Sequence, residues 1–330
     1  MRSKVLNGLT MRSRDVRKKA VTTIRTKPEK DLEIVIDRDI SLNYERRKWL
    51  YLLTLPFMWI LTIWVMFKKI VLRIKPKINT VWFDGVSIPC RKIKEGAGSW
   101  RALDIIYNFQ FTQQNGISGK MSNYWIGMIN AQAVRNRLRL VKRELIKIIK
   151  EFAQKEKEIV LLSIASGSAQ GVIEVMKEFK KEDIRIKAIF LDLDPTAIDY
   201  SRKMAKKYGL EDKITFIKGS ITNLEKTTNG IRPHIIEMIG FLDYRPYAKA
   251  VHLVKRIHNF LLPGGKFLTA NICPNPEQHF LKWVIDWPMI YRKPEELGRI
   301  IVEGGFAPEN CQIICEPLQV HALAICHKVA

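Results

Sequence analysis

The segment 163–171, which reads SIASGSAQG, has the residue types and the position of a cofactor-binding turn. It follows the apolar run EIVLL and precedes VIEVMKEF, so a buried strand, a turn of small residues and a helix succeed one another. Small side chains let a nucleotide-like cofactor approach the backbone, and the helix start offers free N–H groups. Only two of the nine residues are glycine and none is acidic, which leaves a modified cofactor loop and a plain tight turn both open.

Two common nucleotide-binding motifs do not fit this turn. The dinucleotide motif G-x-G-x-x-G would need glycine at Ala165, Gly167 and Gln170, and one of the three matches. The P-loop requires Gly-Lys followed by Ser or Thr, and the sequence contains no such run. Both interpretations are therefore weakened.

The elements that must position this turn alternate between strands and helices after residue 157. Continuous apolar runs separated by amphipathic helices are typical of a parallel sheet covered on both faces. The last stretch, CQIICEPLQVHALAICHKV, predicts a closing antiparallel hairpin, which an NAD-type fold does not need. The predicted strands lie within 158–164, 184–194, 213–221, 234–241, 266–272 and 311–329.

This pattern resembles the class I S-adenosylmethionine (SAM)-dependent methyltransferases over residues 118–330. Within them, GISGKMSNYWIGMINAQAVRNRL, EMIGFLDY and DWPMIYRKPEEL resemble a group of methyltransferases of unassigned substrate. The resemblance implies a seven-stranded doubly wound sheet whose last strand is antiparallel, with SAM as the cofactor. We expect an N-terminal hydrophobic anchor helix and a helical lid beside this α/β domain.

The first motif of the family, acidic-x-Gly-x-Gly-x-Gly, falls on Ser163, Ala165, Gly167 and Ala169. Ser163 replaces the acid that in the family helps to hold the methionine amino group. The family places another acid after the second strand to bind both ribose hydroxyls, and Asp192 matches it, since a carboxylate suits a vicinal diol. Its neighbour Asp194, just before Pro195, is predicted to cap the next helix.

The third motif, usually Gly-Asp-Ala near the adenine, appears as Gly219, Ser220 and Ile221. LLPGGKFL, at 261–268, resembles the turn before the fifth strand. Four landmarks in the right order make the match specific. The resemblance therefore implies these cofactor contacts: Ser163, Ala165, Ser166, Gly167, Asp192, Leu193, Gly219, Ser220 and Ile221.

In this fold the acceptor pocket lies over the carboxyl ends of the strands. Arg292 offers a planar fork for a carboxylate or phosphate, and Tyr291 or Asp286 could orient an acceptor oxygen. A structural role is an equal alternative for each candidate. The turn [DN]PP[FYW], typical of enzymes that methylate amino groups, is replaced by EMIG. The candidate catalytic residues are Glu237, Tyr244, Asp286, Tyr291 and Arg292, with Asp243 beside them, and no metal site is indicated.

An uncharged apolar stretch, WLYLLTLPFMWILTIWVMF at 49–67, is close to the length that crosses a bilayer. Basic residues flank both ends, so the positive-inside rule gives no clean orientation, and Pro56 predicts a bend. A single span and a bent anchor on one leaflet both fit. The buried helix of a soluble protein is the third alternative, although such helices usually carry a polar stripe.

The charge of the chain is unevenly distributed. Residues 1–150 carry 31 Lys and Arg against 11 Asp and Glu, whereas residues 151–330 carry 25 against 22. A basic amphipathic helix from Val134 to Phe152 predicts either a helix packed on the domain or one that lies on anionic lipid. The five cysteines form no CxxC pair, which indicates reduced thiols in a cytosol-facing protein.

These patterns predict five regions: a basic, flexible tail (1–48), a membrane anchor helix (49–67), a basic linker on the substrate side (68–117), a helical lid (118–157) and the SAM-binding domain (158–330). The favoured hypothesis is a membrane-associated methyltransferase with its catalytic domain in the cytoplasm, an anionic membrane surface as its partner and a lipid-like or small-molecule acceptor. An RNA-binding methyltransferase and a non-catalytic membrane protein with a decayed cofactor site are the alternatives. The oligomeric state is left open.

Overall fold

The computed structural model describes residues 20–26, 30–42, 48–111, 115–182 and 184–329. In these residues nine strands form one sheet, in the order β1-β2-β8-β9-β7-β6-β3-β4-β5. The strands β3 to β7 pair in parallel, and β9 runs antiparallel to both β7 and β8. Without β1 and β2 this is the predicted seven-stranded doubly wound sheet. The strands are β1 (Ala20–Thr26), β2 (Lys30–Ile36), β3 (Ile159–Ile164), β4 (Ile186–Asp192), β5 (Ile214–Lys218), β6 (Ile235–Ile239), β7 (Lys266–Ile272), β8 (Cys311–Cys315) and β9 (His321–His327).

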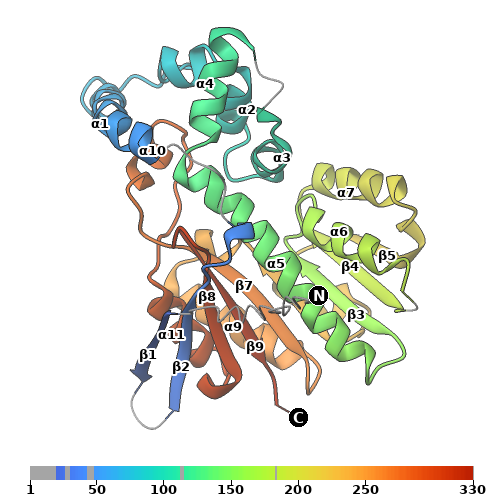
Figure 1. Cartoon of the computed structure of the whole chain (residues 1–330). Coiled ribbons are helices and arrows are strands. Elements are labelled where there is room, and N and C mark those ends of the chain that lie inside the picture. Colours follow the sequence, from blue (N-terminus) through green and yellow to red (C-terminus); the bar gives the residue numbers. More distant parts are fainter. Residues whose placement is uncertain (1–19, 27–29, 43–47, 112–114, 183, 330) are drawn as a thin grey trace, which may run out of the picture.

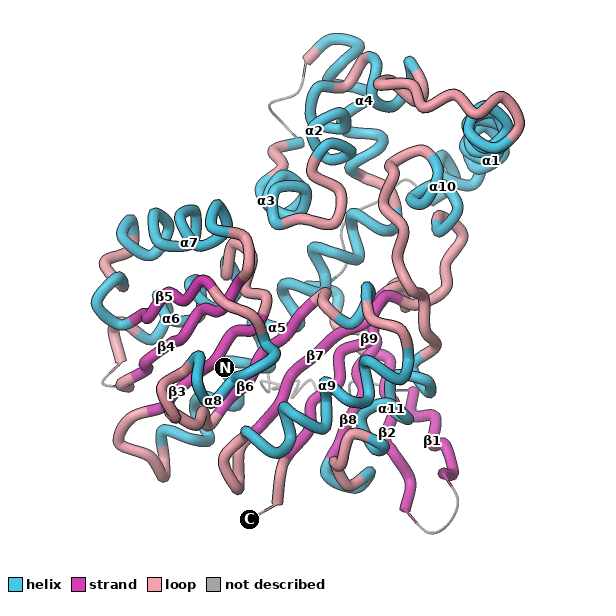
Figure 2. The backbone as a smooth tube through the Cα atoms, turned by 180° about the vertical axis from the view of Figure 1, so that it is seen from behind, coloured by secondary structure: helices cyan, strands magenta, loops and turns pink. Residues whose placement is uncertain are grey.

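Helices cover both faces of the sheet (Figure 2). Side chains alternate along β3, so that Leu162 and Ile164 face one layer while Ile159 and Leu161 face the other. The first layer contains α8, α9 and α11, and the second contains α5, α6 and α7. These helices are α5 (Ile129–Ala153), α6 (Gln170–Phe179), α7 (Pro195–Lys207), α8 (Leu224–Thr227), α9 (Tyr247–Phe260) and α11 (Pro294–Glu303).

A third group of helices lies beyond one end of the sheet, and α5 runs from this group down along the strands (Figure 1). We call the group the lid. Its apolar core includes Phe83, Trp125 and Phe280, whose ring centroids lie 5.0–5.6 Å apart. The lid therefore draws on residues far outside the predicted range 118–157. Its helices are α1 (Lys48–Ile70), α2 (Ile88–Glu95), α3 (Trp100–Asn108), α4 (Gly116–Ile126) and α10 (Gln278–Trp283).

The apolar helix α1 packs one side on the lid. Met58 and Val65 are fully buried in the lid core, whereas Leu53 and Ile60 are 68% and 64% exposed. Tyr124 donates a hydrogen bond to the hydroxyl of Thr54 at 2.6 Å. Among the described residues, Tyr51–Ile70 is the one stretch that is long and apolar enough to cross a membrane, by length and composition alone.

The N-terminal hairpin of β1 and β2 corrects the prediction of a tail over residues 1–48. β2 pairs in parallel with β8, and β1 pairs with β2, so the hairpin extends the sheet beyond β8. Leu32, Ile34 and Val35 are buried, which explains why this segment does not remain a tail. The part of the predicted tail that precedes Ala20 lies outside the described residues.

The basic helix α5 packs on the sheet and on the lid. Its residues Val141, Leu145 and Ile148 lie in the core beside β3, which is the packed alternative of the two predicted from the sequence. Part of its basic face is also buried. Arg135 donates to the carbonyl oxygens of Ile106 and Ile126 at 3.2 and 2.9 Å, so it joins α5 to the lid.

Candidate active site

The turn between β3 and α6 has the backbone of a glycine-rich loop. Ala165, Gly167 and Ala169 have φ values of 51°, 55° and 49°, in the left-handed region that favours glycine. These are the three positions at which the motif in the sequence would carry glycine. The turn therefore has left-handed residues at all three glycine positions of the motif, although two of them are alanine. Ala165 and Ala169 adopt a conformation that is strained for alanine.

The carboxylate of Asp192 holds this turn in place. One of its oxygens accepts the N–H of Gly167 at 2.8 Å, and the other accepts the N–H of Asp194 at 2.9 Å. Asp194 in turn caps α7 by accepting the N–H of Thr196, as predicted. Because each carboxylate oxygen has a further lone pair, Asp192 can still accept hydrogen bonds from the two hydroxyls of a ribose.

Around this turn lies a cavity of about 440 Å³, which we call the cofactor cavity. It is bounded on the sheet side by the residues that follow β3, β4 and β6. From the lid side it is covered by α3, where Trp100 packs against Tyr200 at a centroid distance of 4.4 Å, with the rings tilted by 30°. Asp192 and Glu237 both line this cavity, so it presents two carboxyl groups that can accept hydrogen bonds from the hydroxyl and ammonium groups of SAM.

Glu237 lies beside the position where the motif lacks its acid. Ser163 on β3 is paired in register with Glu237 on β6, and the serine hydroxyl lies 2.6 Å from the carboxylate oxygen Oε2. Burial raises the pKa of Glu237 to about 7, although the Ser163 hydroxyl and the charge of Arg137 lower it. The neighbouring strand therefore supplies a carboxyl group that can accept a hydrogen bond from an ammonium group in the cavity.

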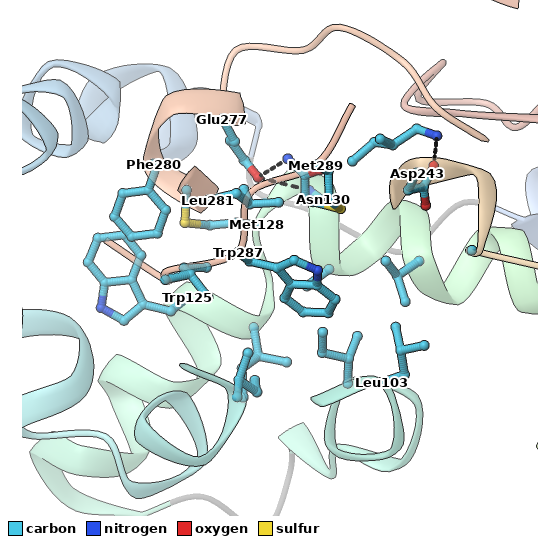
Figure 3. A pocket seen from close by; sticks show the side chains of 18 of the residues that line it. Leu103, Trp125, Met128, Asn130, Asp243, Glu277, Phe280, Leu281, Trp287 and Met289 are labelled. Atoms are coloured by element: carbon cyan, nitrogen blue, oxygen red, sulfur yellow. Dashed lines mark hydrogen bonds between the residues drawn. The ribbon is translucent and has the colours of Figure 1, made fainter. Parts of the chain in front are cut away.

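A second, largely apolar cavity adjoins the first, and we call it the apolar chamber. It lies between the lid, the N-terminal half of α5 and the segment after β7, and it is lined by Trp125, Phe280 and Trp287 among others (Figure 3). Glu277 stands at its edge and accepts the backbone N–H groups of Ile129 and Asn130 at 2.9 and 2.8 Å. The residues that line both cavities are Leu103, Arg137, Gly240, Tyr244 and Trp287.

A family model described as "Putative methyltransferase" matches residues 45–280, more than two thirds of the chain. The chain belongs to this methyltransferase family. The match begins near the start of α1 and ends in α10, so the family includes the lid as well as the cofactor turn.

Solved structures share the fold of this chain. A Bordetella parapertussis protein described as a possible exported protein has a TM-score of 0.63 at 15% identity and covers 83% of this chain and 96% of that chain. The CMeT domain of the citrinin polyketide synthase has a TM-score of 0.53 at 14% identity, over 74% of this chain and 66% of that one. No curated protein matches the chain.

Five of the nine predicted cofactor residues line the cofactor cavity: Ala165, Ser166, Gly167, Asp192 and Leu193. Ser163 lies just behind the wall, where it is 1% exposed and contacts Glu237. The third motif does not line either cavity. Its Ser220 instead caps a short 3₁₀ turn by accepting the N–H of Thr222 at 3.2 Å, and the N–H of Gly219 donates to the Asp192 carbonyl oxygen at 2.9 Å.

The predicted catalytic residues divide into two groups. Glu237 lines the cofactor cavity, and Tyr244 lies at the junction, where its hydroxyl accepts the indole N–H of Trp287 at 2.6 Å. Burial raises the pKa of Tyr244 to about 12, so its hydroxyl keeps its proton at neutral pH. Asp286 lies outside both cavities and pairs with Lys69, which ties the segment after α10 to α1.

Tyr291 and Arg292 also lie outside the cavity linings. The guanidinium of Arg292 is held by the Leu242 carbonyl at 2.8 Å and the Asn271 side chain at 2.6 Å, and it also contacts the Arg245 carbonyl. These hydrogen bonds join the loops around Arg292 and occupy its guanidinium. Arg292 therefore does not form the predicted clamp for a carboxylate or phosphate.

Sequence reasoning missed the contribution of α3 and α5 to the cofactor cavity. Trp100 and Arg101 begin α3, and both donate to the hydroxyl of Thr196 on α7, at 3.2 and 2.6 Å. The run GSWRAL contains a usable signal, because Ser99 before an amphipathic segment is a helix cap. No local signal points to Arg137, since its role depends on packing between α5 and β6.

Proposed function

We propose that this methyltransferase uses SAM and transfers the methyl group to an amphiphilic, lipid-like acceptor at the cytoplasmic leaflet of a membrane. The carrying observation is the apolar chamber that adjoins the cofactor cavity. The chamber has a volume of about 80 Å³. Its lining of aromatic and aliphatic side chains, with few polar groups, suits a short apolar segment of an acceptor whose remainder extends outside the chamber. Nucleobase recognition would require stacking together with several hydrogen bonds to base edges.

In the proposed complex the cofactor lies along the turn 165–170. Asp192 accepts hydrogen bonds from the ribose hydroxyls, Glu237 accepts them from the methionine ammonium group, and Trp100 closes the cavity from the lid. SAM supplies an electrophilic methyl group on a sulfonium. The chain contributes alignment and the exclusion of water, because an in-line displacement mainly needs the acceptor atom to be positioned in a dry site.

The exposed side of α1 supports the membrane part of the proposal. Leu53, Ile60 and Ile63 are between 59% and 68% exposed, although the opposite side of the helix packs on the lid. Just after α1, Arg73, Lys75 and Lys77 are exposed and complement anionic headgroups. A helix that is held along the lid by one side suits a position in the plane of the interface better than a span.

The cysteines support the cytoplasmic side. All five are buried and none forms a disulfide, which is the pattern expected in a reducing compartment.

Cofactor binding is tested by calorimetric titration of the full chain with S-adenosylhomocysteine. Asp192→Ala should weaken binding by about 10- to 100-fold, since hydrogen bonds to a charged group contribute about 1.5–3 kcal/mol. Asp212→Ala removes an exposed carboxylate outside both cavities and should leave the affinity unchanged. Wild-type protein that fails to bind would remove SAM from the proposal.

Membrane docking is tested by cosedimentation with vesicles of phosphatidylcholine and phosphatidylglycerol at 7:3. The triple variant Leu53→Ser, Ile60→Ser, Ile63→Ser should lose at least tenfold in affinity, because partial burial of each side chain contributes about 1 kcal/mol. The matched control Ile117→Ser, Ile231→Ser, Val329→Ser alters exposed apolar residues outside α1. Equal losses in both variants, or no loss in the first, would contradict docking through α1.

A further inference from the structure

Arg137 is a buried cation at the junction of the two cavities. The residue is 3% exposed and lines both the cofactor cavity and the apolar chamber. Its Nη2 donates to the Tyr107 hydroxyl at 3.2 Å, whereas its Nε is buried without a partner. None of the ion pairs within 4.0 Å among the described residues includes Arg137. A charge buried in this way is costly unless a ligand pairs with it.

The nearest carboxyl groups form no direct ion pair with Arg137. Asp243 uses an oxygen to accept the N–H of Ile272 at 2.8 Å, and Glu237 contacts Ser163. Burial raises the pKa of both carboxyl groups, although the charge of Arg137 opposes this shift. The guanidinium therefore keeps a buried Nε–H that no group among the described residues accepts and that a ligand can use.

The backbone of Gly240 borders the guanidinium. This residue has a φ of 78°, and a Cβ atom there would lie 3.6 Å from Nη1 of Arg137. On the chamber side stands His321, which is 3% exposed and has no partner at either ring nitrogen. Burial and the charge of Arg137 hold the pKa of His321 well below its usual value, so the ring is neutral and can donate one N–H.

We propose that Arg137 and His321 form a subsite for the carboxylate head of the acceptor, whose adjoining apolar segment enters the chamber. The guanidinium fork donates to the carboxylate, and the neutral imidazole donates a further hydrogen bond. His321 lines the chamber and not the cofactor cavity, which places the subsite on the acceptor side. This inference rests on the proposed function, because it takes the chamber to be the acceptor's. Arg137 thus has the role that the sequence suggested for Arg292.

The test compares three ligands with the same tail: octanoate, octan-1-ol and octyltrimethylammonium. Each is titrated calorimetrically into the full chain saturated with S-adenosylhomocysteine. Octanoate should bind at least tenfold more tightly than octan-1-ol, and octyltrimethylammonium should not bind. Octan-1-ol binding as tightly as octanoate would overturn the carboxylate assignment.

Two variants test whether the preference for octanoate over octan-1-ol depends on Arg137. Arg137→Met should reduce octanoate affinity by about 10- to 100-fold and leave octan-1-ol binding within a factor of two. Its melting temperature should be equal or higher, because a buried unpaired charge is removed. Arg139→Met alters an exposed arginine on the same helix and should change neither affinity. Unchanged octanoate binding in Arg137→Met would overturn the proposal.

The methionine end of SAM also carries a carboxylate. A separate titration tests whether the subsite binds that carboxylate instead of the carboxylate of the acceptor. Wild type and Arg137→Met are titrated with SAM and with decarboxylated SAM, in the absence of octanoate. The proposal expects the same ratio of the two affinities in both proteins. A ratio that collapses to one in Arg137→Met would assign the subsite to the cofactor and overturn the acceptor assignment. Failure of wild type to bind either cofactor would instead refute the proposed function.

Discussion

At the residue scale, Glu237 places a carboxyl group beside Ser163, which replaces the acid of the motif. Serine lacks the charge that the motif usually provides. Parallel pairing with the neighbouring strand β6 nevertheless brings the Glu237 carboxyl group to within 2.6 Å of the serine hydroxyl. The sequence could place both residues at strand ends. It could not pair them, because the register between β3 and β6 depends on two strands that are far apart in the chain.

This pairing predicts that cofactor affinity depends on pH. Glu237 has its pKa raised to about 7, and only the ionised carboxylate pairs with an ammonium group. Affinity for S-adenosylhomocysteine should therefore be constant above pH 8 and fall by up to tenfold per unit as protons compete below pH 7. Calorimetric titrations from pH 5.5 to 8.5 measure this. Glu237→Gln should bind weakly with a flat profile, and a wild-type profile that is equally flat would contradict the role of Glu237.

A second residue-scale prediction concerns strain in the cofactor turn. Ala165 has a φ of 51°, a conformation that costs an L-residue roughly 1–2 kcal/mol. Ala165→Gly should therefore stabilise the protein by up to about 1 kcal/mol, after the greater entropy of glycine in the unfolded chain is subtracted. Ala205→Gly, in the helix α7, should destabilise it by about 1 kcal/mol. Denaturant unfolding compares the two, and destabilisation by Ala165→Gly would show that the alanine is not strained.

At the element scale, the sheet and its covering helices follow from the sequence more completely than the lid does. Continuous apolar runs such as 159–164 predict buried parallel strands, and Asp194 with Pro195 predicts the start of α7. The apolar run of α1 does not indicate which side of this helix packs on the lid. Val65 is buried and Ile63 is exposed, although both are aliphatic, so composition cannot separate the packed side from the exposed one.

The N-terminal hairpin is also not predicted from the sequence, because the basic residues around it indicate a tail. Its docking depends on Gly298 of α11, where a Cβ atom would lie 2.2 Å from Cδ2 of Leu32 on β2. Gly298→Ala should destabilise the protein by about 1–3 kcal/mol through overpacking. The double variant with Leu32→Val, which shortens that side chain, should recover part of this loss. Equal melting temperatures for wild type and Gly298→Ala would show that the hairpin is not tightly docked.

At the scale of the whole molecule, the positive charge of the N-terminal half serves two different purposes. Arg135 and Arg137 are buried on α5, where Arg135 joins this helix to the lid and Arg137 lines both cavities. Arg73, Lys75 and Lys77 remain exposed beside the apolar side of α1. Net charge alone therefore overstates the surface available to an anionic partner.

This division predicts a two-part salt dependence of membrane binding. The Debye length falls from about 10 Å at 0.1 M salt to about 3 Å at 1 M, so the contribution of exposed basic residues, about 1 kcal/mol each near an anionic surface, should largely disappear. Affinity for the same mixed vesicles of phosphatidylcholine and phosphatidylglycerol should fall at least tenfold in cosedimentation across this range. Binding to pure phosphatidylcholine should be weaker and independent of salt, because it reflects burial of the apolar side of α1. Complete loss of vesicle binding at high salt, with displacement by RNA at low salt, would favour a nucleic-acid partner instead.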